Sequence, residues 1–459
     1  MKGAGLVGAA LLLATPIQSA GADECQLSFI PRGNDATGHF MGGTELRQLV
    51  VHQGKLYAAN GYWEDRPGAE GVQGSQILVL DAPAAGWRVE HVFGDRLPRG
   101  AYRDFVVSTL TSVRFATDGT GAALPGAVPM LVASTWDRTG MSRVFTRDEA
   151  TGAWSATVLA QDPPQPNFLP QIRSFGFHRD RRTGVDRIFA GHSPRGIFSG
   201  VYDAAAKRIR WDPQSEFDFA MASRDANPGT SDWLRAGSFA EANGVLYASV
   251  GQQIFVRDDG NRPAWRLVYT NPKPGHSETG LRGLTAIANP KGGGQVLLAT
   301  VEGNASRIIR VDPADGTVTS ELDLVDFLAK AWGVRATYVI AAYNDMARVP
   351  EPPRGEALVI GLESFIPRPA TLPPGQSSVD VGYGRLEAGG WYLIRHPDAR
   401  YELKQIVLPP AQTRDLVAVR TAIASPFAGE TGVLYLGGYD ANKAAAHNTA
   451  WIARTRPAP

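Results

Sequence analysis

The sequence predicts an all-β fold, a seven-bladed β-propeller whose N-terminal strand closes the last blade. The main observation is a repeated stretch in which an apolar residue and an arginine precede a strand-like run. The arginines of the five clear copies are Arg47, Arg173, Arg235, Arg282 and Arg420. Two weaker copies have Thr109 and Tyr338 in the corresponding place. Seven copies at spacings of roughly 45 to 80 residues are typical of a propeller or a repeat array.

Each copy continues as a four-stranded unit. A short hydrophobic strand follows the arginine strand, and a third strand then ends at an aspartate, such as Asp81 or Asp312. Aspartate favours tight turns because its side chain bonds the backbone two residues further on. Tryptophans open the fourth strand in four copies, at Trp87, Trp154, Trp211 and Trp265. This order predicts one antiparallel blade per copy.

The last copy ends without a fourth strand, whereas residues 26–30 form a strand without a repeat of their own. We expect these residues to pair as the missing outer strand, because closing the ring removes exposed sheet edges. Residues 323–332 have apolar side chains at helical spacing and predict a helix between blades five and six.

The N-terminus has the three-part form of a secretory signal peptide: Lys2, an apolar run over residues 6–15, and small residues at 20–22. We therefore expect a signal peptide over residues 1–22 and a secreted or periplasmic propeller over residues 23–459, with no membrane span. The net charge of only +1 over 459 residues does not indicate a nucleic-acid-binding protein. Cys25 is the only cysteine, so no internal disulfide can form.

The arginines all precede the innermost strand of their blade, so we expect them to meet at one mouth of the central channel, together with residues at the ends of the second strands. The planar fork of arginine suits a carboxylate, sulfate or phosphate. The predicted partner is an acidic glycan or another anionic small molecule, bound by Arg47, Arg173, Arg235, Arg282, Arg420, Asn60, Trp136, Glu302 and Tyr338. Alternatively, the arginines staple neighbouring blades by pairing with Glu241, Glu302, Glu363, Asp137 or Asp440.

The candidate catalytic residues at this mouth are His192, His276, Tyr62 and Tyr439. Histidine titrates near neutral pH and suits general acid or base catalysis. His52 and His178 lie five residues beyond their arginines, far along the strand, and are interpreted as structural. Tyr343-Asn344-Asp345 is a further polar tip.

No nucleotide, serine-nucleophile or histidine-metal motif is found, and no cofactor is predicted. Asp440 and Asn442 are the residues that could ligate calcium, since this ion prefers clustered oxygen atoms.

The sevenfold layout, the terminal strand exchange and the export signal resemble the seven-bladed β-propeller polysaccharide lyases that act on uronic-acid glycans, including those that cut rhamnose from glucuronate. The resemblance covers the whole mature chain. It implies that arginines neutralise the uronate carboxylate, that His192 or His276 removes the adjacent proton, and that Tyr62, Tyr439 or the other histidine protonates the leaving oxygen.

Two alternatives stay open. A glycoside hydrolase would need a pair of carboxylates, for which Glu302 and Glu363 come from successive blades. A non-catalytic exported propeller would bind an anionic ligand or a partner protein at the same mouth.

Overall fold

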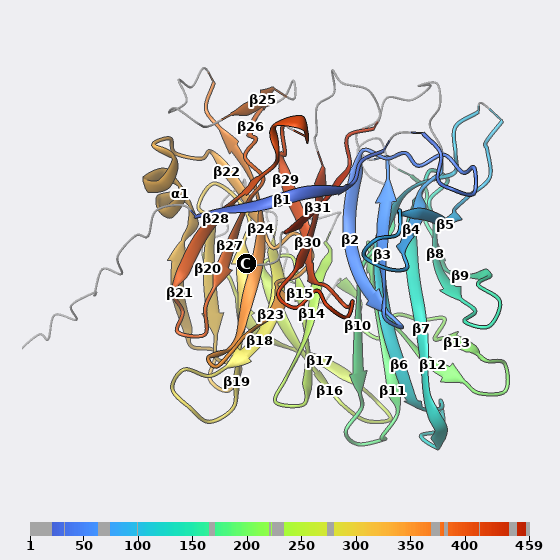
Figure 1. The fold of residues 1–459 in the computed structure, drawn as a ribbon. Helices are drawn as coiled ribbons and strands as arrows, with labels where there is room; N and C mark the ends of the chain where they lie inside the picture. Colours follow the sequence, from blue (N-terminus) through green and yellow to red (C-terminus); the bar gives the residue numbers. More distant parts are fainter. Residues whose placement is uncertain are drawn as a thin grey trace, which may run out of the picture.

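The computed structural model describes residues 21–31, 33–62, 74–98, 100–164, 170–219, 222, 234–272, 280–368, 377–380, 384–412, 414–439 and 448–455. Strands make up nearly all of the regular structure in this part of the chain (Figure 1). Their pairings join them into seven antiparallel groups of four within these residues. The predicted all-β propeller class is confirmed.

The first four blades each follow one uninterrupted run of four strands. Blade one contains β2 (Glu45–His52), β3 (Lys55–Gly61), β4 (Gln76–Leu80) and β5 (Arg88–Val92). Blade two contains β6 (Asp104–Thr117), β7 (Ala123–Asp137), β8 (Met141–Arg147) and β9 (Trp154–Gln161). Blade three contains β10 (Gln171–Arg179), β11 (Asp186–Ser193), β12 (Gly196–Asp203) and β13 (Arg208–Trp211). Blade four contains β14 (Ala236–Ala242), β15 (Val245–Val250), β16 (Gln253–Asp258) and β17 (Ala264–Thr270).

The remaining blades carry the departures from this pattern. Blade five contains β18 (Leu281–Ala288), β19 (Gln295–Val301), β20 (Arg307–Val311) and β21 (Val318–Asp323). Blade six contains β23 (Ala347–Glu351), β24 (Gly355–Ile366), β27 (Trp391–Arg395) and β28 (Tyr401–Val407), and β24 also pairs with β22 (Tyr338–Ala341) and β26 (Arg385–Glu387), next to β25 (Ser378–Asp380). Blade seven contains β29 (Ala418–Ala424), β30 (Leu434–Tyr439), β31 (Trp451–Thr455) and β1 (Gly21–Phe29).

The first strand of the described chain closes blade seven, as predicted. β1 runs antiparallel to β31, with Cys25 opposite Thr455, and lies beside the C-terminal strands in Figure 1. Its first residues also pair in parallel with β28 of blade six, where Gly21 lies opposite Lys404. One segment therefore joins two blades, and Cys25 within it is buried and forms no disulfide with the described residues.

The innermost strands follow one another around the ring. β2 contacts β6 on one side and β29 on the other, and contacts continue from β6 through β10 and β14 to β18. The blades pack face to face, which covers both sides of the middle strands. β4 and β12 are accordingly buried almost throughout, although an exposed strand would alternate. The apolar core is thus a series of clusters between successive blades.

The predicted helix between blades five and six is confirmed as α1 (Leu324–Trp332). It begins at Asp323, whose side chain accepts a hydrogen bond from the Asp326 N–H at 2.9 Å, and it ends at Gly333 with φ of 69°. The buried face of α1 packs into the largest described apolar cluster, through Leu324, Val325, Leu328 and Trp332. No helix in the described part of the chain is long and apolar enough to cross a membrane.

Candidate functional site

Arginine side chains from separate blades converge on the aromatic ring of Tyr343. The distances from the guanidinium carbon to the ring centroid are 3.8 Å for Arg420, 4.3 Å for Arg173, 4.8 Å for Arg282 and 5.2 Å for Arg47. Arg235 lies beside them, because it lines one recess together with Arg173 and Arg282. We call Arg47, Arg173, Arg235, Arg282 and Arg420 the arginine cluster. The predicted meeting of the five arginines is therefore observed.

The segment around Tyr343 supplies hydrogen-bond acceptors to this cluster. Arg47 Nη2 donates to the Tyr343 hydroxyl. Arg173 Nη2 and Arg282 Nη1 donate to the Tyr343 carbonyl oxygen, at 3.2 and 3.3 Å. Arg173 Nη1 donates to Asn344 Oδ1 at 2.8 Å, and Asn344 Nδ2 donates to the Arg47 carbonyl at 2.5 Å. The chain thus places its own polar groups at the centre of the cluster.

β-Bulges turn the arginines toward the channel. In β2 the pairing skips Arg47, so this residue has no partner opposite it on β3. The same shift occurs at Arg173 in β10 and at Arg420 in β29. An extra residue of this kind bends the strand and re-aims its side chain. In β6 the bulge falls at Ser108 rather than at Thr109, the residue that the repeat predicts there.

In blade six a short loop between β22 and β23 takes the place of the bulge. β22 and β23 both pair antiparallel with β24, and residues 342–346 between them leave the sheet. Gly283 makes this approach possible, because a Cβ there would lie 2.3 Å from the Ala342 Cβ. In blade six the residue inside the ring is therefore Tyr343 and not Tyr338. The Tyr338 hydroxyl lies at the edge, where it donates to Glu302 Oε1 at 2.7 Å.

Three carboxylates compensate part of the positive charge. Glu302 forms an ion pair with Arg282, and Glu363 Oε2 lies 2.5 Å from Arg420 Nη1. The fully buried carboxylate of Glu45 lies 3.4 Å from Arg47 Nε and 3.3 Å from Arg420 Nε. Five arginines against three carboxylates leave a positive excess among these residues. Glu302 and Glu363 thus pair with arginines, as the stapling alternative predicts. The remaining positive charge of the arginine cluster can still attract an anion.

The other carboxylates that the stapling alternative named lie elsewhere. Glu241 bonds His178 at 2.8 Å, and Asp137 forms an ion pair with Arg143 at 2.7 Å. Asp440 lies outside the described residues. The expected structural role of His178 agrees with its second contact, to Asp259 at 3.1 Å.

The arginine cluster changes the acidity of Tyr343. Burial alone would raise the pKa of its hydroxyl, but the charges of Arg173, Arg47 and Arg420 outweigh burial and lower this pKa to about 8. Burial, followed by repulsion from neighbouring arginines, lowers the pKa of Arg173 to about 9, which leaves the guanidinium charged at neutral pH. Tyr343 is therefore a hydroxyl that can ionise near neutral pH within a positive field.

A small recess remains beside the cluster. Its volume is about 20 Å³, and Arg173, Arg235, Arg282 and Glu302 line it together with glycine backbone. This volume accommodates one water-sized group. The glycines at 237, 251 and 280 bring backbone close to that space. A single anionic oxygen atom is the largest group that fits here without rearrangement.

Of the other predicted binding residues, Trp136 and Glu302 contact arginines of the cluster, whereas Asn60 bonds the backbone of Gly42. The Trp136 ring lies 4.9 Å from the Arg47 guanidinium carbon. Asn60 is buried and its amide donates to the Gly42 carbonyl, so it supports a turn near the mouth. Glu302 and Tyr338 are joined to each other and, through Glu302, to Arg282.

The predicted catalytic residues are less favourably placed than Tyr343. The Tyr439 hydroxyl donates to Glu363 Oε1 at 2.8 Å, and its ring lies 4.5 Å from the Arg420 guanidinium carbon, but only 2% of the residue is exposed. Tyr62 is 1% exposed and packs beneath Gly42. Both side chains are buried, so neither lies on an open surface of the mouth.

His192 lies one strand out from the channel. It is fully buried, its Nε2 lies 2.8 Å from the Ser142 hydroxyl of blade two, and the Arg195 N–H donates to its Nδ1. Burial lowers the pKa of His192 to about 4, so the ring is neutral at physiological pH. None of its described hydrogen bonds reaches the arginine cluster, and its catalytic role stays a prediction. His276 lies outside the described residues.

The calcium hypothesis is likewise not tested, because Asp440 and Asn442 lie outside the part of the chain that the structure describes. Among the described residues, no group of three or more histidine, cysteine, aspartate or glutamate side chains is arranged to hold a metal ion.

A scan against protein-family models and a search of curated proteins find no match for the chain. Among solved structures, it is similar to the WD40 repeats of RRP9, with a TM-score of 0.46, 11% identity, and coverage of 96% of this chain and 100% of the other. It is similar to the Dos1 propeller, with a TM-score of 0.44, 10% identity, and coverage of 93% and 95%. It is also similar to a candidate exo-β-1,3-galactanase from Bifidobacterium bifidum S17, with a TM-score of 0.31, 14% identity, and coverage of 65% of this chain and 96% of the other. At these values the likeness carries no argument about function.

Sequence reasoning missed two members of this site. Tyr343 was visible only as a polar tip, since the excursion of residues 342–346 has no counterpart in the other blades. Glu45 precedes Arg47 by two residues, and no other arginine of the cluster has a carboxylate in that place. One signal could have pointed to Tyr343: the sixth copy of the repeat has Tyr338 where five other copies have an arginine.

Proposed function

We propose that the protein is a carbohydrate-active enzyme that cleaves uronate-containing glycans by β-elimination at the arginine cluster. The observation that carries this proposal is the Tyr343 hydroxyl, which lies among guanidinium groups and has its pKa lowered to about 8. A general base works best when its pKa lies near the working pH.

The reaction needs three functions that this site can supply. A positive group neutralises the uronate carboxylate, which makes the adjacent C–H more acidic. A base removes that proton, the bond from the next carbon to the glycosidic oxygen breaks, and a double bond forms between the two carbons. An acid then protonates the departing oxygen.

Arg173 and Arg235 are the proposed carboxylate-binding groups. The described hydrogen bonds of Arg173 go to the neutral oxygens of Tyr343 and Asn344, so its charge is not neutralised by a bound carboxylate. Both arginines line the recess that fits one oxygen atom. One carboxylate oxygen would enter the recess, and the sugar would lie outside it, at the mouth.

Tyr343 is the proposed base in its ionised form, and the same hydroxyl can return the proton to the departing oxygen. Tyr439 is a less favourable acid because its hydroxyl already donates to Glu363. His192 is less favourable because its ring is buried against Ser142.

Hydrolysis of the glycosidic bond would instead need two carboxyl groups flanking that bond. Glu302 and Glu363 each form an ion pair with an arginine of the cluster. These ion pairs hold the guanidinium groups in place and leave neither carboxylate free to act on a glycosidic bond. The site therefore favours elimination over hydrolysis.

A non-catalytic role is the second candidate, and one observation favours it. Tyr343 already gives its hydroxyl and carbonyl oxygens to three arginines, which leaves a recess of only about 20 Å³. The cluster would then be an internal staple, and the protein would bind an anionic ligand or a partner protein without turnover.

Product analysis separates these functions. The purified protein is incubated with uronate-rich glycans, and both ultraviolet absorbance of unsaturated uronate and new reducing ends are measured. Elimination produces both signals together. Reducing ends without unsaturation would show hydrolysis, and saturable binding without either signal would show a binding protein.

Export is part of the same proposal. A secretory signal peptide over residues 1–22 would deliver the enzyme to the periplasm or the medium, where acidic glycans occur. N-terminal sequencing of the protein recovered from those fractions should give Asp23 as the first residue. Recovery only inside cells with residues 1–22 retained would contradict export.

A further inference from the structure

A cavity of about 480 Å³ lies along the innermost strands, where Asp345 and Met346 form part of its wall. The first strands of five blades line it, through Leu49, Leu284, Ala422 and Ile423 among others. Each of these follows its arginine in the same strand, so the cavity lies deeper along the channel than the cluster. Its volume is in the range of pockets that hold small organic molecules.

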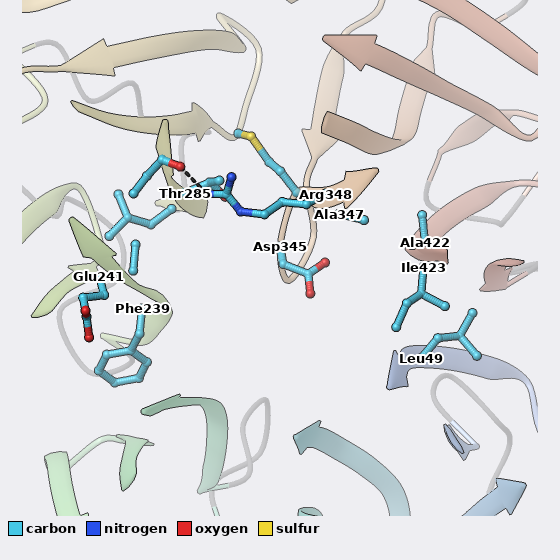
Figure 2. A pocket seen from close by; sticks show the side chains of 13 residues that line it. Leu49, Phe239, Glu241, Thr285, Asp345, Ala347, Arg348, Ala422 and Ile423 are labelled. Carbon is cyan, nitrogen blue, oxygen red and sulfur yellow. Dashed lines mark hydrogen bonds between the residues drawn. The ribbon is translucent and has the colours of Figure 1, made fainter. Parts of the chain in front are cut away.

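One carboxylate points into this space. Figure 2 shows the Asp345 side chain directed into the cavity, with Leu49, Ala422 and Ile423 on one side and Thr285 and Arg348 on the other. No hydrogen bond or ion pair of Asp345 to the described residues is found. Asp345 is exposed to this space, so an incoming cation can reach its carboxylate.

The other charged groups of the lining are already occupied. Glu241 bonds His178 at 2.8 Å. Arg348 Nη1 bonds Glu356 at 2.8 Å, and its Nη2 donates to the Ala286 carbonyl. The charged residues of the lining are thus two carboxylates, Glu241 and Asp345, and one arginine, Arg348, and the charge without a described partner is that of Asp345.

We propose that this cavity is a second binding site, which takes a small organic cation with an apolar body. The ammonium group would bind the Asp345 carboxylate through a charge-assisted hydrogen bond, and the apolar body would pack against Leu49, Leu284 and Ile423. An anion is excluded by the same carboxylate, and a neutral apolar molecule would leave it unpaired. The site is independent of the elimination proposed at the arginine cluster.

The pH dependence of binding follows from the same carboxylate. The protein around Asp345 displaces part of its water of hydration, which raises the pKa of this carboxyl group to about 6. Protonation below that pH removes the charge that attracts the cation. Affinity for an ammonium probe is therefore expected to rise as the pH increases through about 6, and binding should release protons near this pH.

Calorimetric titration with cyclohexylmethylammonium tests the proposal, with cyclohexylmethanol and cyclohexanecarboxylate as the neutral and anionic controls. The full chain should bind the ammonium probe, and the Asp345→Asn variant should weaken this binding at least about tenfold. Equal affinity for the alcohol, equal affinity in the Asp345→Asn variant, or no binding of any probe would overturn the proposal.

A second variant tests the location. Ala347→Phe places a ring in the cavity without altering Asp345. It should abolish binding of the ammonium probe while thermal unfolding shows a folded protein. Binding that survives in Ala347→Phe would place the ligand elsewhere and contradict the inference.

Discussion

The guanidinium carbon of Arg420 lies 3.8 Å from the centroid of the Tyr343 ring. Blade six lacks an arginine at this position and contributes instead the aromatic ring that the other arginines surround. A tyrosine offers a negative ring face, a hydroxyl and a carbonyl oxygen, so it stabilises several guanidinium groups at once. The arrangement explains how five positive side chains lie together and why the pKa of the Tyr343 hydroxyl is lowered.

Titration of Tyr343 tests this electrostatic arrangement. The difference in tyrosinate ultraviolet absorbance between the wild type and Tyr343→Phe should titrate with a midpoint near pH 8, because the arginines lower this pKa to about 8. Since the unfolded chain titrates at about 10, the wild type should also gain stability relative to Tyr343→Phe as the pH rises from about 8 to about 10. A midpoint near 10 would show that the arginines do not act on this hydroxyl.

Removal of Arg282 should destabilise the fold strongly. The change leaves the buried carboxylate of Glu302 without its ion-pair partner, and we expect Arg282→Ala to cost about 3–5 kcal/mol of unfolding free energy. The double variant Arg282→Ala/Glu302→Gln should recover part of this loss in chemical denaturation. Arg266→Ala is the matched control, because its pair with Asp258 is exposed and is worth roughly 0–1 kcal/mol. Equal losses in both single variants would contradict a buried staple at Glu302.

Much of the fold could be predicted from the sequence, because one pattern is repeated seven times. Arginine positions, Asp turns and the unpaired N-terminal strand are local signals, and they predicted the blades and their closure. The bulge at Arg47 could not be predicted. A bulge arises from the pairing of two strands, and no residue type at position 47 identifies it. The burial of the His192 ring against Ser142 could not be predicted for a related reason: side chains alternate across a strand, so a position near a strand end does not say which face a residue occupies.

Deleting residues 23–29, the part of β1 that remains after the proposed cleavage, should destabilise the whole ring. β1 provides the outer strand of blade seven and pairs with blade six, so its removal exposes the edge of β31 and opens both contacts. We expect a large fall in melting temperature and concentration-dependent aggregation. The control is Leu27→Val, which keeps the strand and its pairing. A deleted chain that melts as the control does would contradict the closure by β1.

Replacement of His192 separates a structural from a catalytic role. The buried neutral ring has its pKa lowered to about 4, whereas in the unfolded chain it titrates near 6.5. Between these values the unfolded state binds more protons, so the wild type should lose stability as the pH falls from about 6.5 to about 4. His192→Gln should reduce this pH dependence and leave formation of unsaturated product unchanged at neutral pH. Loss of product in a folded His192→Gln protein would instead support the predicted catalytic role of His192.

The pH–rate profile for formation of unsaturated product, in the wild type and in Tyr343→Phe, tests the proposed function most directly. The wild-type rate on a uronate-rich glycan should rise with pH through about 8 and level off above it, because Tyr343 must ionise to act as the base. Tyr343→Phe should still bind the glycan but form no unsaturated product. A folded Tyr343→Phe protein with the wild-type rate and profile would contradict the account.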